Sequence, residues 1–176
     1  MHRVLFLCSL LGIGYVNMFT LTNFVISTLE NCDPNNASEM FLRVTKTSGR
    51  QYLDFSINFK SPFDEKIGFT TSISSSADGA RYTKLFDIRD KYACKGANKY
   101  LGQFWYEIQQ AAQYPPGVCP MPKRRYRARN HSLDFSKIAL QTFPFGKLRI
   151  KILVFENAAP ENIFYCITTD LFNVDN

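Results

Sequence analysis

Strict alternation of apolar and polar residues is the feature that most constrains what this chain can fold into. The segment 146–156, GKLRIKILVFE, puts Lys147, Arg149 and Lys151 on one side. The opposite side carries Leu148, Ile150, Ile152 and Val154. Because successive side chains of a β-strand point to opposite faces, this pattern predicts a strand with one buried face and one wet face.

The same period recurs along the chain and predicts an all-β fold. Segment 161–172 forms the clearest hairpin with 146–156 through the loop 157–160, and its inward set is Ile163, Tyr165, Ile167 and Leu171. Two further segments alternate in the same way. The inward residues of the first are Leu53, Phe55, Ile57 and Phe59, and those of the second are Ile67, Phe69, Thr71 and Ile73. Shorter strands are expected at 21–29, 40–46 and 85–88. With the basic segment described below, we expect a cup-like antiparallel β-sandwich of seven or eight strands, which fills one domain over residues 21–176.

One segment has a different period and predicts a single short inserted helix. In 97–113, ANKYLGQFWYEIQQAAQ, the residues at helical spacing are Leu101, Phe104, Trp105, Ile108 and Ala112. Asn98 is the expected N-cap, and the Pro-Pro-Gly run at 115–117 is the expected stop. Two interpretations of the aromatic stripe stay open. Phe104 and Trp105 either pack into the core or form a flap over an apolar cavity.

The N-terminus is typical of a secretory signal peptide. Arg3 precedes an uncharged apolar run over 4–16, which suits a signal sequence and is too short to cross a bilayer. No A-x-A motif occurs, so we place the cut between residues 14 and 20, with an uncleaved anchor as the alternative. Removing residues 1–20 leaves 20 Lys and Arg against 15 Asp and Glu, a charge of +5. We therefore expect a secreted, extracellular chain without stable membrane insertion, whose charge suits acidic partners such as anionic lipid headgroups.

Four cysteines remain after the signal segment, namely Cys32, Cys94, Cys119 and Cys166. An even number in a secreted chain predicts two disulfides, for which three pairings are possible. Cys32 lies near the mature start and Cys166 in the last predicted strand, while Cys94 and Cys119 flank the predicted helix. These positions favour Cys32 with Cys166 and Cys94 with Cys119. The rival zinc site lacks a C-x-x-C pair, so neither a metal nor a cofactor is expected.

Two Asn-x-Ser sequons, at Asn36 and Asn130, predict glycosylation at the surface. The second contains His131, the one histidine that follows the signal segment. A Ser-His-Asp arrangement would have to use this histidine, and a sugar beside it would crowd the substrate. Neither G-x-S-x-G nor H-E-x-x-H occurs in the sequence. We therefore expect no enzymatic activity and no catalytic residues.

The aromatic content favours an apolar binding site. The chain has 16 Phe and 9 Tyr but one Trp, and aromatic side chains fit the pleated, half-buried surface of a sheet. A sandwich whose sheets splay apart opens an apolar cavity that suits a lipid-like ligand. The Phe-Pro-Phe turn at 143–145 either lines the rim of such a pocket or is a buried turn. The candidate ligand-binding residues are Phe55, Phe59, Leu101, Phe104, Trp105, Ile108, Phe143 and Phe145.

The segment 123–129, KRRYRAR, concentrates positive charge. A nucleic-acid patch would conflict with the expected secretion of the chain. Proteolytic processing at this segment would cut a strand of the sandwich. A strand that starts near Arg125 explains it better, because Tyr126 and Ala128 then point inward. Its outer face is a basic ladder of Arg125, Arg127 and Arg129. The ladder either contacts a headgroup or partner, or it blocks unwanted pairing at a sheet edge.

The order of motifs in the C-terminal half resembles a known family. Cys119-Pro120 is followed by a basic-aromatic strand, a Phe-Pro turn, the segment GKLRI at 146–150, and a final strand that holds Cys166. This order resembles the ganglioside-activator family of the wider ML lipid-recognition superfamily. The aromatic-rich variant with four mature cysteines looks most like the insect chemosensory protein B (CheB) family. The resemblance covers most of the mature chain and is strongest from Cys94 onward.

The resemblance implies a cup-shaped sandwich whose cavity takes lipid tails, secretion, and a role in sensing pheromones or other apolar cues. The disulfides of the family would fall on the same two cysteine pairs. Lysosomal members carry further disulfides that this chain lacks, so their ganglioside specificity is not carried over.

The expected function is that of a secreted, non-enzymatic binding protein for a lipid or another apolar ligand. A pheromone or cuticular hydrocarbon, bound in gustatory or pheromone sensing, would fit the resemblance. The alternative is a secreted interaction module that modulates a sensory receptor or channel without carrying a ligand. Nucleic acid is not an expected partner.

Overall fold

The computed structural model describes residues 23–33, 38–141 and 143–173. The expected signal peptide over 1–20 and the sequon residue Asn36 lie outside the described residues. Among the residues described, no helix is long and apolar enough to span a membrane.

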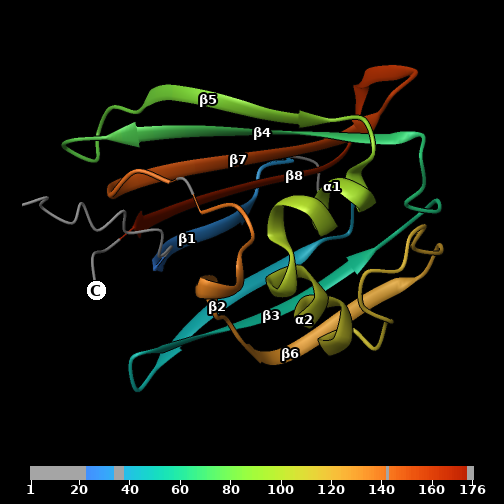
Figure 1. Cartoon of the computed structure of the whole chain (residues 1–176), viewed down its shortest axis with the longest axis horizontal. Helices are drawn as coiled ribbons and strands as arrows, with labels where there is room; N and C mark the ends of the chain where they lie inside the picture. The colour runs from blue at the N-terminus through green and yellow to red at the C-terminus, as the bar shows by residue number, and fades with distance from the viewer. Residues whose placement is uncertain (1–22, 34–37, 142, 174–176) are drawn as a thin grey trace, which may run out of the picture.

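In the described part of the chain, eight strands form two antiparallel sheets, as the alternating patterns predict (Figure 1). The larger sheet has the order β1-β8-β7-β4-β5. Its strands are β1 Phe24–Asn31, β4 Ile67–Ser76, β5 Thr83–Asp90, β7 Gly146–Glu156 and β8 Ala159–Asn173. The smaller sheet has the order β2-β3-β6, with β2 Phe41–Thr47, β3 Arg50–Asn58 and β6 Arg125–Ser132. The fold is therefore the predicted all-β sandwich.

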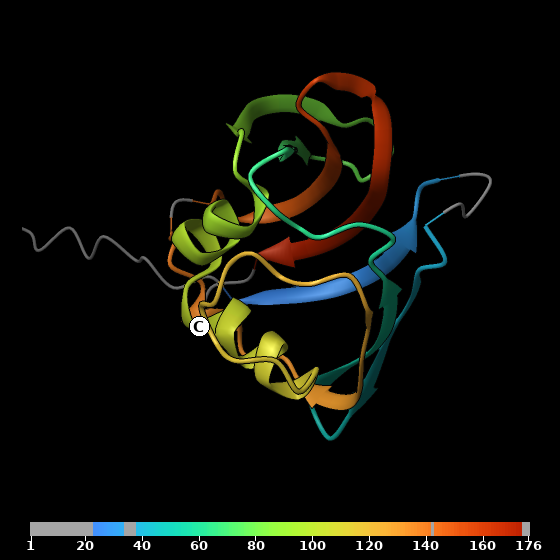
Figure 2. The same cartoon turned by 90° about the vertical axis from the view of Figure 1, so that its right-hand side faces the viewer.

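The two sheets approach each other on one side and splay apart on the other (Figure 2). β1 contacts β2 where the sheets meet. On the opposite side the chain inserts two helices, α1 Ala93–Leu101 and α2 Gln103–Ala111. Because α1 contacts β4 and α2 contacts β6, the helices bridge the gap between the two sheets and close the open side of the cup.

The expectation of one helix capped by Asn98 is wrong. Asn98 lies inside α1, and its side-chain Nδ2 donates to the carbonyl of Gly117 at 2.8 Å. The helix breaks at Gly102, whose φ of 57° and ψ of −130° are open to glycine and strained for other residues. A Cβ at this position would lie 2.9 Å from the Cβ of Ala139, so the segment after β6 packs directly on the break.

The carbonyl groups at the C-terminal ends of both helices accept hydrogen bonds from neighbouring segments. The N–H groups of Ala139 and Leu140 donate to the carbonyls of Leu101 and Tyr100 at the end of α1. At the end of α2, before the prolines, the Arg124 guanidinium donates to the carbonyls of Ala112 and Gln113. A short 3₁₀ helix, η1 Phe135–Lys137, lies in the connection from β6 to β7.

The β7–β8 hairpin is tighter than the expected loop 157–160, because Glu156 pairs with Ala159 and leaves a two-residue turn. A register shift then follows between Val154 and Phe155. Phe164 of β8 is the extra residue at this shift, so the side chains of β8 between the shift and the turn point to the opposite faces from those that the alternation predicts. Ile163, expected on the inner face, is 42% exposed, and Phe164 packs on the buried cluster of Ile67 and Phe69 instead.

Both predicted disulfides are confirmed. Cys32, just after β1, is bonded to Cys166 in β8, and the Cys32 N–H also donates to the Cys166 carbonyl at 2.9 Å. Cys94 in α1 is bonded to Cys119 in the segment before β6. The first bond joins two adjacent strands that are far apart in the sequence, and the second attaches α1 to the connection that leads into the other sheet.

Candidate functional site: an apolar cavity between the sheets

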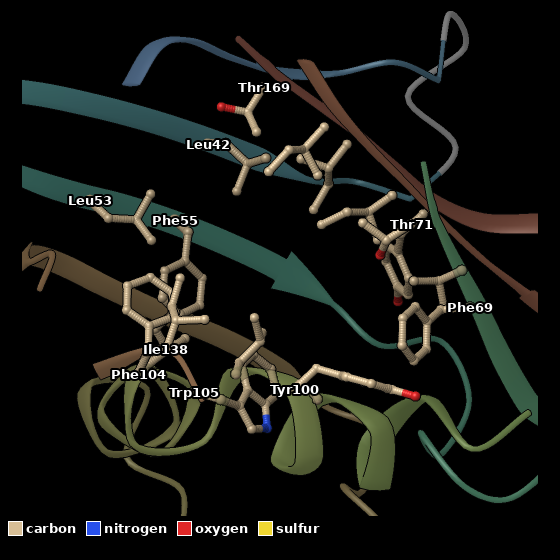
Figure 3. Close-up of a pocket in the computed structure, with 18 of the residues that line it drawn as sticks. Leu42, Leu53, Phe55, Phe69, Thr71, Tyr100, Phe104, Trp105, Ile138 and Thr169 are labelled. Carbon is tan, nitrogen blue, oxygen red and sulfur yellow. The ribbon is translucent and has the colours of Figure 1, made fainter. Parts of the chain in front are cut away.

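A cavity of about 380 Å³ lies between the sheets and is covered by the helices (Figure 3). The larger sheet supplies inward side chains of β4, β5, β7 and β8, for example Phe69, Ile73, Ile88 and Ile152. The smaller sheet supplies Leu42, Leu53, Phe55 and Ile57. The helices supply Ala97, Tyr100, Leu101, Phe104, Trp105 and Ile108. Most residues of the inward sets predicted from alternation therefore form the walls of a hollow, whereas Ile67, Leu148 and Ile163 are not part of its lining.

Seven of the eight candidate ligand-binding residues line this cavity: Phe55, Phe59, Leu101, Phe104, Trp105, Ile108 and Phe143. Phe145 does not, and it is 52% exposed. The reason is strand parity, since Phe145 directly precedes β7 and falls in the same outward set as Lys147 and Arg149. Phe143, two residues earlier in the loop, packs edge-on against Phe24 with ring centroids 5.1 Å apart.

The aromatic stripe of α2 packs on neighbouring side chains and lines the cavity at the same time. The ring of Phe104 stacks on Phe135 of η1, with centroids 5.3 Å apart. Trp105 packs against the buried cluster that contains Leu53 and Phe55. The two interpretations of this stripe are therefore not exclusive, because the helix is itself part of the cavity wall.

The sequence pattern found Leu101 of α1 but missed the rest of this helix. Ala93 and Ala97 line the cavity together with Leu101, and the three residues are spaced four apart on one face of α1. The small side chains of the two alanines, and the exposed Lys95 and Lys99, hide this face from a pattern based on large apolar residues. The i, i+4 spacing of Ala93, Ala97 and Leu101 in the sequence was the signal that could have identified this face.

Most polar groups of the lining are already bonded within the protein. The buried Gln109 side chain accepts a hydrogen bond from the Gly117 N–H at 2.7 Å. The Thr169 hydroxyl donates to the Thr28 carbonyl at 2.8 Å. No charged side chain occurs among the described residues that line the cavity. Because an unpaired charge is costly to bury, this cavity suits an apolar ligand rather than an ionised one.

Tyr165 gives the cavity wall a measurable pH signature. Burial raises the pKa of its phenol to about 12, and the hydroxyl donates to the Asn58 carbonyl at 3.1 Å. The raised pKa means that the resulting stability is fully present below about pH 10 and is lost as the pH rises through 12. We expect the free energy of unfolding to fall over this window by on the order of 1 kcal/mol, since solvent screens part of the effect.

The measurement is urea denaturation across the alkaline range, with Tyr165→Phe as the matched variant. The variant should lose about 1 kcal/mol at neutral pH with the Asn58 hydrogen bond, and it should show a shallower alkaline decline. An equally steep decline in the variant would assign the pH dependence to other groups.

The basic ladder lies on the outer face of the smaller sheet, away from the cavity. β6 starts at Arg125, with Tyr126 and Ala128 buried and Arg125, Arg127 and Arg129 exposed. Arg125 pairs with Glu39 at 2.9 Å. The N–H of Asn130 donates to the Asp54 carboxylate, and this bond, together with Arg43, lowers the pKa of Asp54. The ladder is therefore part of a mixed-charge surface rather than an isolated patch.

The remaining titratable groups do not offer a metal site in the described part of the chain. His, Cys, Asp and Glu do not gather there into a group of three that could hold a metal ion. His131 is half-buried, and its burial lowers its pKa. Asn130 of the sequon is exposed on the surface of β6.

No protein-family model matches this sequence, and no curated protein matches it. Among solved structures, the chain is similar to chicken MD-1, which was solved in complex with lipid IVa. The match covers 88% of this chain and 99% of the MD-1 chain, with 7% sequence identity and a TM-score of 0.44. A likeness of this extent does not decide what the chain binds.

Proposed function

We propose that this protein is a secreted, non-enzymatic binding protein that holds a lipid or another apolar ligand in the cavity between its sheets. The cavity itself carries the proposal. Its volume of about 380 Å³ lies in the range of small-molecule sites, and its described lining contains no charged side chain. A solid sandwich core would leave no room for a ligand.

The driving force for binding is the removal of the ligand's apolar surface from water. Each 100 Å² of apolar surface that enters the cavity contributes roughly 2.5 kcal/mol, before the cost of association is subtracted. The walls are held by two sheets and two disulfides, so little of this energy is spent on ordering the protein.

The resemblance to the CheB family supports a finer proposal, in which the ligand is a pheromone or cuticular hydrocarbon and the protein acts in gustatory or pheromone sensing. The apolar N-terminal run over 4–16 and the two disulfides support secretion. The exposed Asn130 supports glycosylation of its sequon. Both features fit a protein that works outside the cell.

The test is extraction of the secreted protein with organic solvent, followed by mass spectrometry. We expect one class of lipid or hydrocarbon to copurify in amounts approaching one molecule per protein. The emptied protein should then take up a fluorescent apolar probe such as N-phenylnaphthylamine. Protein that yields no ligand from native tissue and takes up no probe would rule out the carrier function.

The outer face of the smaller sheet favours a second candidate, the interaction with a receptor or channel. Phe41 is 52% exposed and lies in one row with Ser56 and Arg127 across β2, β3 and β6. Arg127 is exposed and makes no ion pair with any described residue. An exposed aromatic ring and an unpaired cation on the same face of a sheet are typical of a contact with a protein partner. Charge reversal at Arg127 should weaken such a contact without changing ligand uptake.

A further inference from the structure

One hydroxyl group in the cavity wall has no partner. Thr71 lies on β4 and points into the cavity (Figure 3). The indole Nε1 of Trp105, which also belongs to the lining, is buried without a partner among the described residues. Within residues 23–33, 38–141 and 143–173, the Thr71 hydroxyl likewise forms no hydrogen bond with a side chain or backbone group. It therefore differs from the hydroxyls of Thr169 and Tyr165, which bond to the carbonyls of Thr28 and Asn58.

The surroundings of Thr71 explain why the protein cannot satisfy it. The inward neighbours along β4 are Phe69 and Ile73, and the cross-strand partners are Ile88 of β5 and Ile152 of β7. All four side chains are apolar and line the cavity. β4 is paired on both sides, so the backbone groups near the hydroxyl are used in the sheet.

Water is a poor substitute partner at this position. A buried water molecule needs two to four polar partners, and the wall around Thr71 offers one. The hydroxyl is therefore left unsatisfied until a molecule with its own polar atom enters the cavity.

We propose that Thr71 selects ligands that carry one neutral oxygen, such as an alcohol, ester or ketone, on an otherwise apolar hydrocarbon chain. The proposal rests on the ligand-carrier function proposed above and names the ligand class. The oxygen lies against the middle of β4, and the chain fills the apolar remainder of the cavity. The oxygen is neutral because no charged side chain occurs in the described lining to pair with a carboxylate or an amine. A site with an unpaired buried polar group discriminates against the analogue that leaves it unpaired.

The test compares ligands of equal chain length on one pair of variants. Dodecane, dodecanol and dodecyl acetate compete for the cavity with the probe N-phenylnaphthylamine, and the quantity measured is the ratio of their affinities. We expect the wild type to prefer the oxygenated ligands by about tenfold over dodecane, the value of one good hydrogen bond. Thr71→Val should lower this ratio several-fold, while Thr71→Ser should keep it.

Thr70→Val is the matched control, because Thr70 is the neighbouring residue on β4 and lies on the outer face of the sheet, where its hydroxyl accepts a hydrogen bond from Arg89 Nε at 3.2 Å. The control should keep the preference for oxygenated ligands. Thermal melting of the ligand-free protein gives a second measurement. Thr71→Val should melt at the same or a higher temperature, since it removes an unpaired hydroxyl from an apolar wall.

The outcomes separate the two proposals. If Thr71→Val keeps the tenfold preference, or if it melts well below the wild type, the role of Thr71 is wrong and the carrier function stands. If none of the three ligands displaces the probe from the wild type, or if the probe does not bind, both proposals fail.

Discussion

Replacement of Ala97 by tryptophan is expected to abolish the binding of apolar ligands while the fold survives. Ala97 lies on α1, and its small side chain is part of the cavity lining. An indole group at this position would point into the hollow and occupy the space that a ligand chain needs. Because the side chains of the protein leave a space of about 380 Å³ between the sheets, the larger side chain does not have to displace core atoms.

The affinity for N-phenylnaphthylamine should fall by at least about tenfold in Ala97→Trp, because the ligand can no longer bury its apolar surface. Gln103→Trp is the matched control. Gln103 is the exposed first residue of α2 and its side chain makes no hydrogen bond with a described residue, so the same substitution there should leave the affinity unchanged. Thermal melting of Ala97→Trp should stay close to the wild type or rise, because the indole gains buried contacts. Wild-type affinity in a folded Ala97→Trp protein would show that the ligand binds elsewhere.

The strands could be predicted from the sequence because their pattern is local. Leu53, Phe55, Ile57 and Phe59 alternate with polar residues, and a strand is the element in which that period gives one apolar face. The irregularities were not predictable in the same way. Ile163 follows the pattern but lies outside the cavity, because the shift in the β7–β8 pairing depends on contacts between two strands.

The break between the helices shows the same limit. Residues 97–113 have continuous helical spacing, and a glycine inside such a pattern does not by itself end a helix. The break occurs because Ala139, far along the chain, packs against Gly102. The contact belongs to the tertiary structure, so no window of sequence around residue 102 contains it.

The cavity is the part of the site that the sequence indicated least directly. An apolar inward set such as Phe69 and Ile73 is the same whether two sheets meet in a solid core or enclose a hollow. What separates the two cases here is the pair of helices between the open sides of the sheets, with α1 against β4 and α2 against β6. The sequence pattern predicts that Thr71 points inward. That its hydroxyl lacks a hydrogen-bond partner follows only from its neighbours on β5 and β7, which the pattern does not identify.

Removal of the Cys32–Cys166 disulfide is expected to cost more stability, whereas removal of the Cys94–Cys119 disulfide is expected to cost more ligand affinity. The bond between Cys32 and Cys166 closes a sequence separation of 134 residues, and that between Cys94 and Cys119 a separation of 25. On the chain-entropy relation, the double variant Cys32→Ala/Cys166→Ala should lose about 5 kcal/mol and Cys94→Ala/Cys119→Ala about 3.5 kcal/mol of unfolding free energy. Urea denaturation of both variants measures the difference.

Ligand affinity should suffer more from removal of the Cys94–Cys119 disulfide, because the loop that this bond closes contains the helices of the cavity wall. Cys94 anchors α1, which presents Ala97 and Tyr100 to the cavity, so loss of its bond loosens the helices that cover the hollow. Cys32 and Cys166 lie in the paired β1–β8 region, where the Cys32 N–H still bonds the Cys166 carbonyl and the strands hold each other in register. We therefore expect Cys94→Ala/Cys119→Ala to bind N-phenylnaphthylamine at least about fivefold more weakly than Cys32→Ala/Cys166→Ala at a temperature where both are folded. Equal affinities in the two variants would mean that the sheets alone, without the anchored helices, hold the cavity open.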